Sequence, residues 1–358
     1  MGFQLYQWKL RPNPPGVAIR PRRIDASAGP KKTTGTADRR NMRSRTNRSF
    51  EKALCFISVL VVTAGAFPFG AVAARIMNPE YATEESVYVN VERGGHVVSG
   101  LDESNFRVYQ GGLSRPFRLA EPESQVNIGV LVENSKSSAR YTGDIAAALA
   151  GLRKNASTGH LYALTTFSGE VGMQSDFSRD ISRIALSTRE MGDSVWSEIN
   201  TYDAVYEMVD RMKHLPGRRV LILIGSGVDT CSDHKLDDVK KKLEAENVTI
   251  YSTALGTAFR NGASPYSSKL PRMDFGQGEG VLRMLAHKSG GYAWFPSRAD
   301  AFGDAIKGIM RNIASQYRLV YVTDAHGSFQ YSPIKVEAFR SVGDRHEEYK
   351  VLVRDGWR

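Results

Sequence analysis

Cysteine is nearly absent from this 358-residue chain, which contains only Cys55 and Cys231. Cys55 lies in an N-terminal apolar stretch that we expect to be removed, so Cys231 would have no partner for an intrachain disulfide. Asp229, Asp233 and His234 stand near Cys231, but four ligands within six residues rarely close around one metal ion. We therefore expect a polar loop at this point and a fold that is stabilised by its hydrophobic core.

The common catalytic motifs are absent as well. The sequence has no Gly-x-Ser-x-Gly turn, no His-Glu-x-x-His, no glycine-rich phosphate loop and no paired-carboxylate motif. Ser135 stands beside Lys136, and His234 stands near Asp229, which are fragments of a nucleophile-and-base arrangement. Adjacent side chains in an extended segment point to opposite sides, however, so Ser135 and Lys136 would not act together. The sequence indicates a protein that is not an enzyme.

Most of the chain has no net charge. Residues 1–52 hold 13 Lys and Arg against three Asp and Glu, which accounts for the whole formal charge of +10. The remaining residues hold 35 of each sign. A basic leader before a neutral body is typical of an exported protein, and it argues against a body that binds nucleic acid. We expect no nucleic-acid partner.

Residues 42–73 have the pattern of a signal peptide. Basic residues precede an apolar stretch at 53–67, and the small-x-small sequence at 71–73 has the form of a cleavage site. We therefore predict export to the periplasm, the cell envelope or the medium. The alternative is a membrane anchor formed by 53–67, although this stretch is short for a membrane span and Pro68 follows it.

Two segments flank the predicted signal peptide. Residues 1–41 are rich in Pro, Arg, Gly and Thr without periodicity, so they are either a disordered tail or the consequence of a start codon assigned too early. Residues 74–85 are predicted to form a linker. Contact with a membrane is expected only through an uncleaved leader.

Strand and helix patterns alternate along the middle of the chain. Ile128–Val132 and Arg219–Ile224 are largely apolar runs, which are typical of strands buried on both faces. Apolar residues at helical spacing lie between such strands. This alternation predicts an α/β domain at 125–316, whose doubly wound, mostly parallel sheet is covered by helices on both sides.

Short strands with alternating apolar residues occur at both ends of this pattern, at 86–124 and at 317–358. Three such strands with one apolar face cannot form a core alone. We therefore expect the two sets to pack together into one small β unit that is discontinuous in sequence.

Polar residues follow the first strand of the α/β pattern directly, at Glu133, Asn134, Ser135, Lys136 and Ser137. In an open α/β fold, the carboxyl edge of the sheet is the usual ligand position. One carboxylate and two hydroxyls at alternate positions could offer hard oxygen ligands to a divalent cation. The alternative is that the two serines only cap the helix that follows.

Seven short motifs follow one another between Val87 and Arg358. They are GLDESNFRVYQGG, ENSKS, TYDAV, GRRVLILIGSGVD, TALGT, LAHKSGGYAWFP and SQYRLVYV. In this order they resemble the von Willebrand factor type A (VWA) domain, and more narrowly the exported VWA-related proteins of acidobacteria. The resemblance implies a VWA fold, an adhesion-type function in protein binding, and a metal-ion-dependent adhesion site (MIDAS) in the crevice.

The metal site that the resemblance implies is altered in this chain. The family has Asp-x-Ser-x-Ser in a first loop, Thr in a second and Asp in a third. Both serines are kept, but the first Asp is Glu133, the last Asp aligns with Ser226, and the Thr position falls near Ile199. The implied ligands, with the nearest replacements included, are Glu133, Ser135, Ser137, Thr201, Ser226 and Asp229.

Mg²⁺ requires near-octahedral oxygens at roughly 2.1 Å. The altered ligands therefore favour a degenerate MIDAS that has no cofactor. The alternative is a metal-dependent ligand binder, in which water completes the coordination of Mg²⁺, Mn²⁺ or Ca²⁺.

We expect the loops around the crevice to bind an unknown protein partner. The residues predicted at this rim are Asn134, Lys136, Arg140, Asn200, Asp233 and His234. A second hypothesis is a structural component of the cell envelope that binds through the exposed strand edges of its β unit.

Overall fold

The structure is a computed structural model, and it describes residues 83–185, 196–256, 275–298, 300–323, 331–342 and 345–357. These residues belong to one structural unit, which spans Val72–Arg358. The predicted signal peptide, the residues before it and residues 74–82 of the predicted linker lie outside them, so these predictions stay predictions. Residues 83–85, which were also predicted as linker, belong to the first strand.

The strands are β1 (Thr83–Arg93), β2 (His96–Val97), β3 (Phe106–Gln110), β4 (Leu113–Arg115), β5 (Phe117–Ala120), β6 (Val126–Glu133), β7 (Leu161–Phe167), β8 (Val171–Ser178), β9 (Arg218–Gly225), β10 (Val248–Ala254), β11 (Ala293–Trp294), β12 (Tyr317–Thr323), β13 (Ser332–Val342), β14 (Arg345–Glu348), β15 (Lys350–Leu352) and β16 (Gly356–Trp357). The α-helices are α1 (Thr142–Asn155), α3 (Thr201–Met212), α4 (Leu236–Ala245), α6 (Phe275–Lys288) and α7 (Ala301–Ala314). Short 3₁₀ helices are η2 (Glu103–Asn105), η3 (Ser138–Tyr141) and η4 (Ile181–Arg183).

Six strands form the central sheet, in the order β11-β10-β9-β6-β7-β8. β6 pairs in parallel with β7 and β9, and β10 pairs in parallel with β9 and β11, whereas β8 is antiparallel to β7. All eight residues of β6 are buried, because helices cover both faces of the strand, and this explains its nearly continuous apolar sequence. The predicted α/β class with a doubly wound, mostly parallel sheet is confirmed.

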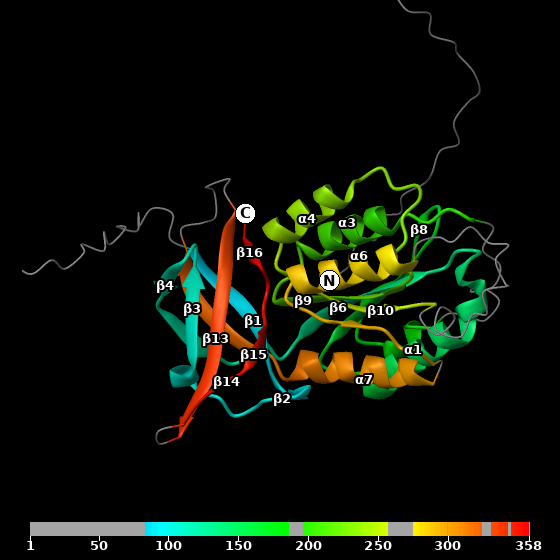
Figure 1. Cartoon of the computed structure of the whole chain (residues 1–358). Helices are drawn as coiled ribbons and strands as arrows, with labels where there is room; N and C mark the ends of the chain where they lie inside the picture. Colours follow the sequence, from blue (N-terminus) through cyan, green and yellow to red (C-terminus); the bar gives the residue numbers. More distant parts are fainter. Residues whose placement is uncertain are drawn as a thin grey trace, which may run out of the picture. The chain divides into compact units, whose positions relative to one another are not determined.

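Helices cover the central sheet on its two faces (Figure 1). On one face α1 and α7 enclose a core that contains Ile128 of β6, and on the other face α3, α4 and α6 enclose a core that contains Leu131. α1 and α7 approach each other closely, because a Cβ atom on Gly151 would lie 3.1 Å from the Cα atom of Gly303. Among the described residues, no helix has the length and apolarity needed to cross a membrane.

Strands from both ends of the chain build two antiparallel sheets, which we call the β unit (β1–β5 and β12–β16). Their orders are β15-β1-β12-β5 and β14-β13-β3-β4. Alternate residues of β1 (Val87, Val89 and Val91) are fully buried in a core shared with β3, β12 and β13. The predicted pairing of N-terminal with C-terminal strands is thereby confirmed.

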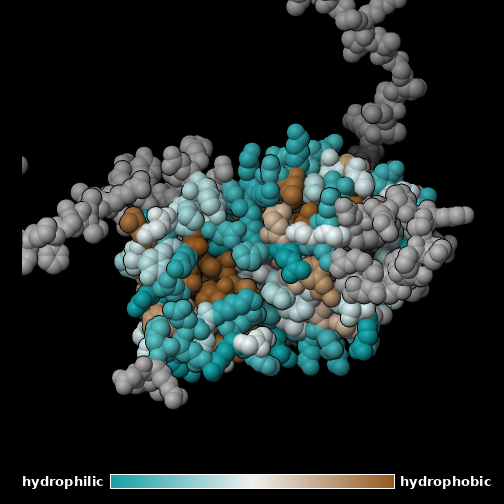
Figure 2. Space-filling model, in the orientation of Figure 1, coloured by the Kyte–Doolittle hydropathy of each residue, from teal (hydrophilic) through white to brown (hydrophobic). Residues whose placement is uncertain are grey.

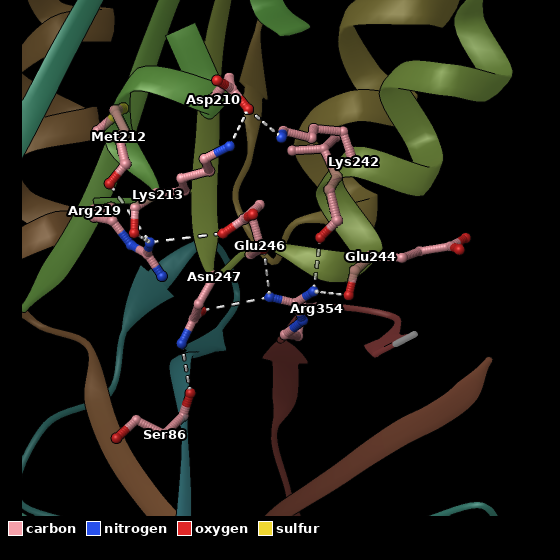
Figure 3. Close-up of polar contacts among 11 residues, drawn as sticks. Ser86, Asp210, Met212, Lys213, Arg219, Lys242, Glu244, Glu246, Asn247 and Arg354 are labelled. Carbon is pink, nitrogen blue, oxygen red and sulfur yellow. Dashed lines mark hydrogen bonds and ion pairs between the residues drawn. The ribbon is translucent and has the colours of Figure 1, made fainter. Parts of the chain in front are cut away.

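Arg354 joins the β unit to the end of α4 (Figure 3). Its guanidinium donates hydrogen bonds to the main-chain oxygens of Leu243 at 2.7 Å, Glu244 at 3.3 Å and Glu246 at 3.1 Å. The last carbonyls of a helix have no partner within the helix and carry partial negative charge, so a cation is stabilised there. Burial nevertheless lowers the pKa of Arg354 to about 10.

Arg218, the first residue of β9, caps α7 in a similar way. It donates to the main-chain oxygen of Ile313 at 2.6 Å and to the side-chain oxygen of Gln316. Gln316 in turn donates to Asn90 of β1 at 2.8 Å and to the hydroxyl of Tyr251 in β10 at 3.0 Å. Arg218 begins β9, and the end of α4 that binds Arg354 directly precedes β10, so the β unit is anchored at the amino edge of the central sheet.

Candidate functional site

The polar residues predicted to line the crevice follow β6 and β9, the two middle strands of the central sheet, and we refer to the loops that carry them as the crevice loops. The chain continues from β6 to α1 on one face and from β9 to α4 on the other. Such a divergence is the topological switch point of a doubly wound sheet, where neighbouring loops separate at the carboxyl edge. Glu133 ends β6, and Ser226 follows β9 directly.

Glu133 holds the two loops together. Its side chain is only 1% exposed, and one carboxylate oxygen accepts a hydrogen bond from the Ser135 hydroxyl at 2.9 Å. The other oxygen accepts from both the main-chain N–H and the hydroxyl of Ser226, each at 2.6 Å. Three donors from two loops therefore converge on one buried carboxylate.

Burial dominates the electrostatics of Glu133. Removal from water raises the pKa of its carboxyl group, and the hydrogen bonds from Ser226 and Ser135 offset part of this effect because they favour the ionised form. Glu133 is therefore easier to protonate than a solvent-exposed glutamate.

The serines after β6 bond mainly to one another and to their own loop. The hydroxyls of Ser135 and Ser137 lie 3.0 Å apart, and Ser138 donates from its hydroxyl to the main-chain oxygen of Ser135 at 2.8 Å. Ser135 also accepts from the main-chain N–H of Ser138 at 3.2 Å, whereas Ser137 makes no side-chain cap to η3. Ser135 thus bonds both to the start of η3, as the capping alternative predicted, and to the carboxylate of Glu133.

Thr201 and Asp229 take part in a neighbouring network. The Thr201 hydroxyl donates to the main-chain oxygen of Val228 at 2.5 Å, while the main-chain N–H of Val228 donates to the Ser226 hydroxyl at 3.2 Å. Asp229 accepts from the main-chain N–H of Tyr202 at 3.0 Å, at the start of α3. Thr201 is therefore linked to the Glu133 cluster through one residue, and Asp229 caps a helix.

The residues around Glu133 do not fit a divalent cation in this arrangement. Both oxygens of the single carboxylate accept hydrogen bonds, and the Thr201 hydroxyl is directed to a carbonyl. A hard cation needs several convergent oxygens that present lone pairs. Within the part of the chain that the structure describes, no three His, Cys, Asp or Glu side chains gather in a way that could hold a metal ion.

The predicted rim residues differ widely in exposure. Lys136, Arg140 and Asp233 are exposed, whereas Asn134 is half-buried. Asn200 is only 5% exposed, and its main-chain N–H donates to the Ser168 oxygen at 2.8 Å. Its side chain therefore offers little surface to a partner, and its role at the rim stays a prediction.

His234 pairs with Asp203, a contact that the sequence did not reveal. Its ring nitrogen Nδ1 lies 2.7 Å from the Asp203 carboxylate, and the ring stacks on Tyr206 with centroids 3.8 Å apart. Asp203 also accepts from the main-chain N–H groups of Asp233 and His234, both at 2.9 Å. Asp203 thus positions the loop that leads into α4.

Trp196 is a rim residue that sequence reasoning missed. Its side chain is 41% exposed, and its main-chain oxygen accepts from the N–H of Lys136 at 2.9 Å. The ring packs over Gly169, where a Cβ atom would lie 2.8 Å from it. The only sequence signal was an aromatic residue in a polar loop, which does not distinguish a buried ring from an exposed one.

Comparison with known proteins finds similarity only in solved structures. No protein-family model and no curated protein matches the chain. Among the similar structures, BatB from Bacteroides thetaiotaomicron shares 14% identity over 53% of this chain and 97% of that one, with a TM-score of 0.37. Manganese-loaded Plasmodium vivax TRAP protein shares 12% over 70% and 97%, with a TM-score of 0.39. The vWF domain of the type V pili tip protein Mfa5 from Porphyromonas gingivalis shares 12% over 53% and 95%, with a TM-score of 0.37.

The resemblance to the VWA domain stands at the level of the fold. The sheet order, with polar loops following the strands at its switch point, is that of a doubly wound domain. At these identities and TM-scores, the similar structures do not assign a function or a ligand to this chain. Function has to be argued from the residues at the crevice.

Proposed function

We propose that this protein is an exported, adhesion-type module that binds another protein through the rim of the crevice, with a degenerate MIDAS and no catalytic role. The observation that carries the proposal is the convergence of two loops on buried Glu133, with exposed side chains around them. Loops held by a rigid scaffold are the usual carriers of binding residues. The β unit is anchored at the opposite, amino edge of the sheet, so we assign partner binding to the crevice loops.

The chemistry of the rim supports protein binding. Trp196 offers a partly exposed aromatic surface and its main-chain oxygen accepts from the N–H of exposed Lys136, while Arg140 is exposed four residues further along the same loop. Tryptophan and arginine are enriched among residues that contribute most to protein–protein affinity. Ser135 is buried on the Glu133 carboxylate while the neighbouring Lys136 is exposed, so these two side chains do not form a nucleophile and base.

A capture experiment tests the proposal. The purified protein would be immobilised and incubated with an envelope extract, and bound proteins would be identified by mass spectrometry. We expect Trp196→Ala combined with Lys136→Glu to remove the captured partner. The matched control is Leu113→Ala combined with Lys154→Glu, because Leu113 has the same 41% exposure and lies in the β unit. Capture that survives the rim variant would contradict the proposal.

The second candidate function is structural attachment through the β unit. Figure 2 shows an apolar patch in the region where Figure 1 draws β13 and β15. A groove of about 230 Å³ lies there, and its apolar lining comes from Ile334, Val336, Val351, Leu352 and Val353. In the same experiment, loss of capture in the Leu113→Ala control with retention in the rim variant would favour this function.

A further inference from the structure

Glu133 is one methylene longer than the aspartate expected from the resemblance, and its carboxylate reaches the loop after β9. Its carboxylate reaches across the switch point and accepts hydrogen bonds from Ser226, 93 residues further along the chain. The same carboxylate also accepts from Ser135 in its own loop. One side chain therefore connects the end of β6 with the loop after β9.

The main-chain N–H of Ser226 is the decisive donor. A hydroxyl can rotate its hydrogen away from a cation and present a lone pair, but a main-chain N–H has a fixed direction. This N–H lies 2.6 Å from the carboxylate oxygen, so its hydrogen occupies the side of the oxygen that faces the second loop. A cation bound to that oxygen between the loops would meet this positive hydrogen and would have to displace it.

The space between the loops is also closely filled. A Cβ atom on Gly225 would lie 3.3 Å from the bonded oxygen of Glu133 and 3.3 Å from the ring of Phe167. Such distances are tight for carbon contacts, so glycine at position 225 leaves room for the carboxylate and little more. Ser226, in turn, supplies two donors where a second carboxylate would have supplied negative charge.

We infer that Glu133 replaces a bound cation as the link between the two crevice loops, so that the crevice keeps its shape without any divalent ion. The inference goes beyond the proposed function, because it concerns how the crevice is held together whatever partner it binds. It predicts that the protein is indifferent to chelators and to Mg²⁺, Mn²⁺ and Ca²⁺.

Thermal unfolding and ion titration of the full chain test this inference. The melting temperature of the wild type would be measured in EDTA and in 5 mM Mg²⁺, Mn²⁺ or Ca²⁺, and Mn²⁺ binding would be followed by electron paramagnetic resonance. We expect one melting temperature in all four solutions and no Mn²⁺ site that depends on the crevice. Mn²⁺ binding that is lost in Ser135→Ala and in Glu133→Gln would overturn the inference.

Variants at position 133 provide the second half of the test. Glu133→Gln should stay within a few degrees of the wild type, because the amide oxygen accepts both bonds from Ser226 and the amide nitrogen donates to Ser135. Glu133→Ala should lower the melting temperature by roughly 5–10 °C, because Ser226 is left with unpaired donors. Glu170→Gln, in the exposed loop after β7, serves as the control without effect. If Glu133→Ala melts like the wild type, the carboxylate does not link the two crevice loops. If Glu133→Ala does not fold, the Mn²⁺ titration and the melting temperature of Glu133→Gln test the inference without it.

Discussion

At the scale of single residues, buried charged side chains in this protein link separate structural elements through hydrogen bonds. Arg354 illustrates this, since its N–H groups bond to carbonyls at the end of α4, to Gly356 and to the side chain of Asn247. Its guanidinium also lies 3.3 Å from the centroid of the Trp357 ring. A planar group with several donors suits this site, and a lysine ammonium would not reach the same set of acceptors.

We expect Arg354→Ala to lower the free energy of unfolding by about 3 kcal/mol or more, because several buried carbonyls lose their donor and a cavity opens beside Trp357. Arg354→Lys should recover only part of this loss. Urea unfolding measures both effects. Arg298→Ala is the control, because Arg298 pairs with Asp300 at the surface and its loss should cost below about 0.5 kcal/mol. Equal effects of the two alanine variants would contradict the role of Arg354.

Asp210 provides a prediction about pH. Hydrogen bonds from Lys213 and Lys242 lower the pKa of its carboxyl group from 3.8 to about 2 (Figure 3). A lowered pKa in the folded state means that the stabilisation is present above pH 4 and is lost as the pH falls towards 2. Asp210 is 44% exposed, so we expect Asp210→Asn to cost less than about 1 kcal/mol at pH 7. Urea unfolding curves of variant and wild type should differ at pH 7 and converge near pH 2; a gap that persists at pH 2 would exclude the ion pairs as its cause.

The sequence predicted single residues well where a strand end fixed their position. Glu133, Ser135 and Ser226 meet because each lies at or just after the carboxyl end of a neighbouring parallel strand, which an apolar run makes visible. The burial of Asn200 was not predicted, and Trp196 was missed. Their exposure depends on how the loop before α3 packs on Ser168 and Gly169, and these contacts have no local sequence pattern.

At the scale of elements, the close contact between α1 and α7 depends on a glycine. Alanine normally stabilises a helix relative to glycine by roughly 0.5–1 kcal/mol. At Gly151, however, a Cβ atom would lie 3.1 Å from the Cα and 3.3 Å from the main-chain oxygen of Gly303. We expect Gly151→Ala to destabilise the protein by about 1–2 kcal/mol, because the two helices would have to move apart.

Gly303→Ala is the matched control in this helix pair. A Cβ atom at Gly303 would meet nothing within 4 Å, so the helix propensity of alanine should appear undiminished. We expect this variant to be stabilised by up to about 1 kcal/mol in urea unfolding. Equal signs for the two substitutions would show that crowding between the helices is not what distinguishes them.

The sequence also predicted most elements but not the order of the sheet. Apolar runs and helical spacing mark the strands and helices locally, and they imply a parallel, doubly wound arrangement. Which strand lies beside which is decided by packing between distant residues, such as the register that places Val130 opposite both Leu164 and Ile222. Local sequence patterns likewise did not predict that the strands from the two ends of the chain divide into two sheets.

At the scale of the whole molecule, the β unit and the α/β domain are expected to unfold together. Neither end of the chain completes the β unit alone, since β1 pairs with β12 and β3 pairs with β13. Arg218 and Arg354 then bind this unit to the ends of α7 and α4. Unfolding of either part would break these buried hydrogen bonds, so each part stabilises the other.

This coupling can be measured with two probes on one variant. In a protein with Trp8, Trp196 and Trp294 replaced by Phe, fluorescence reports Trp357 of the β unit, whereas circular dichroism at about 222 nm follows the α-helices, all of which, among the described residues, lie between β6 and β12. Coincident urea midpoints are the expected result, as for a single cooperative transition. If the Trp357 signal changes at a lower urea concentration than the helical signal, the β unit is an independent module. The buried arginines would then join two parts that unfold independently.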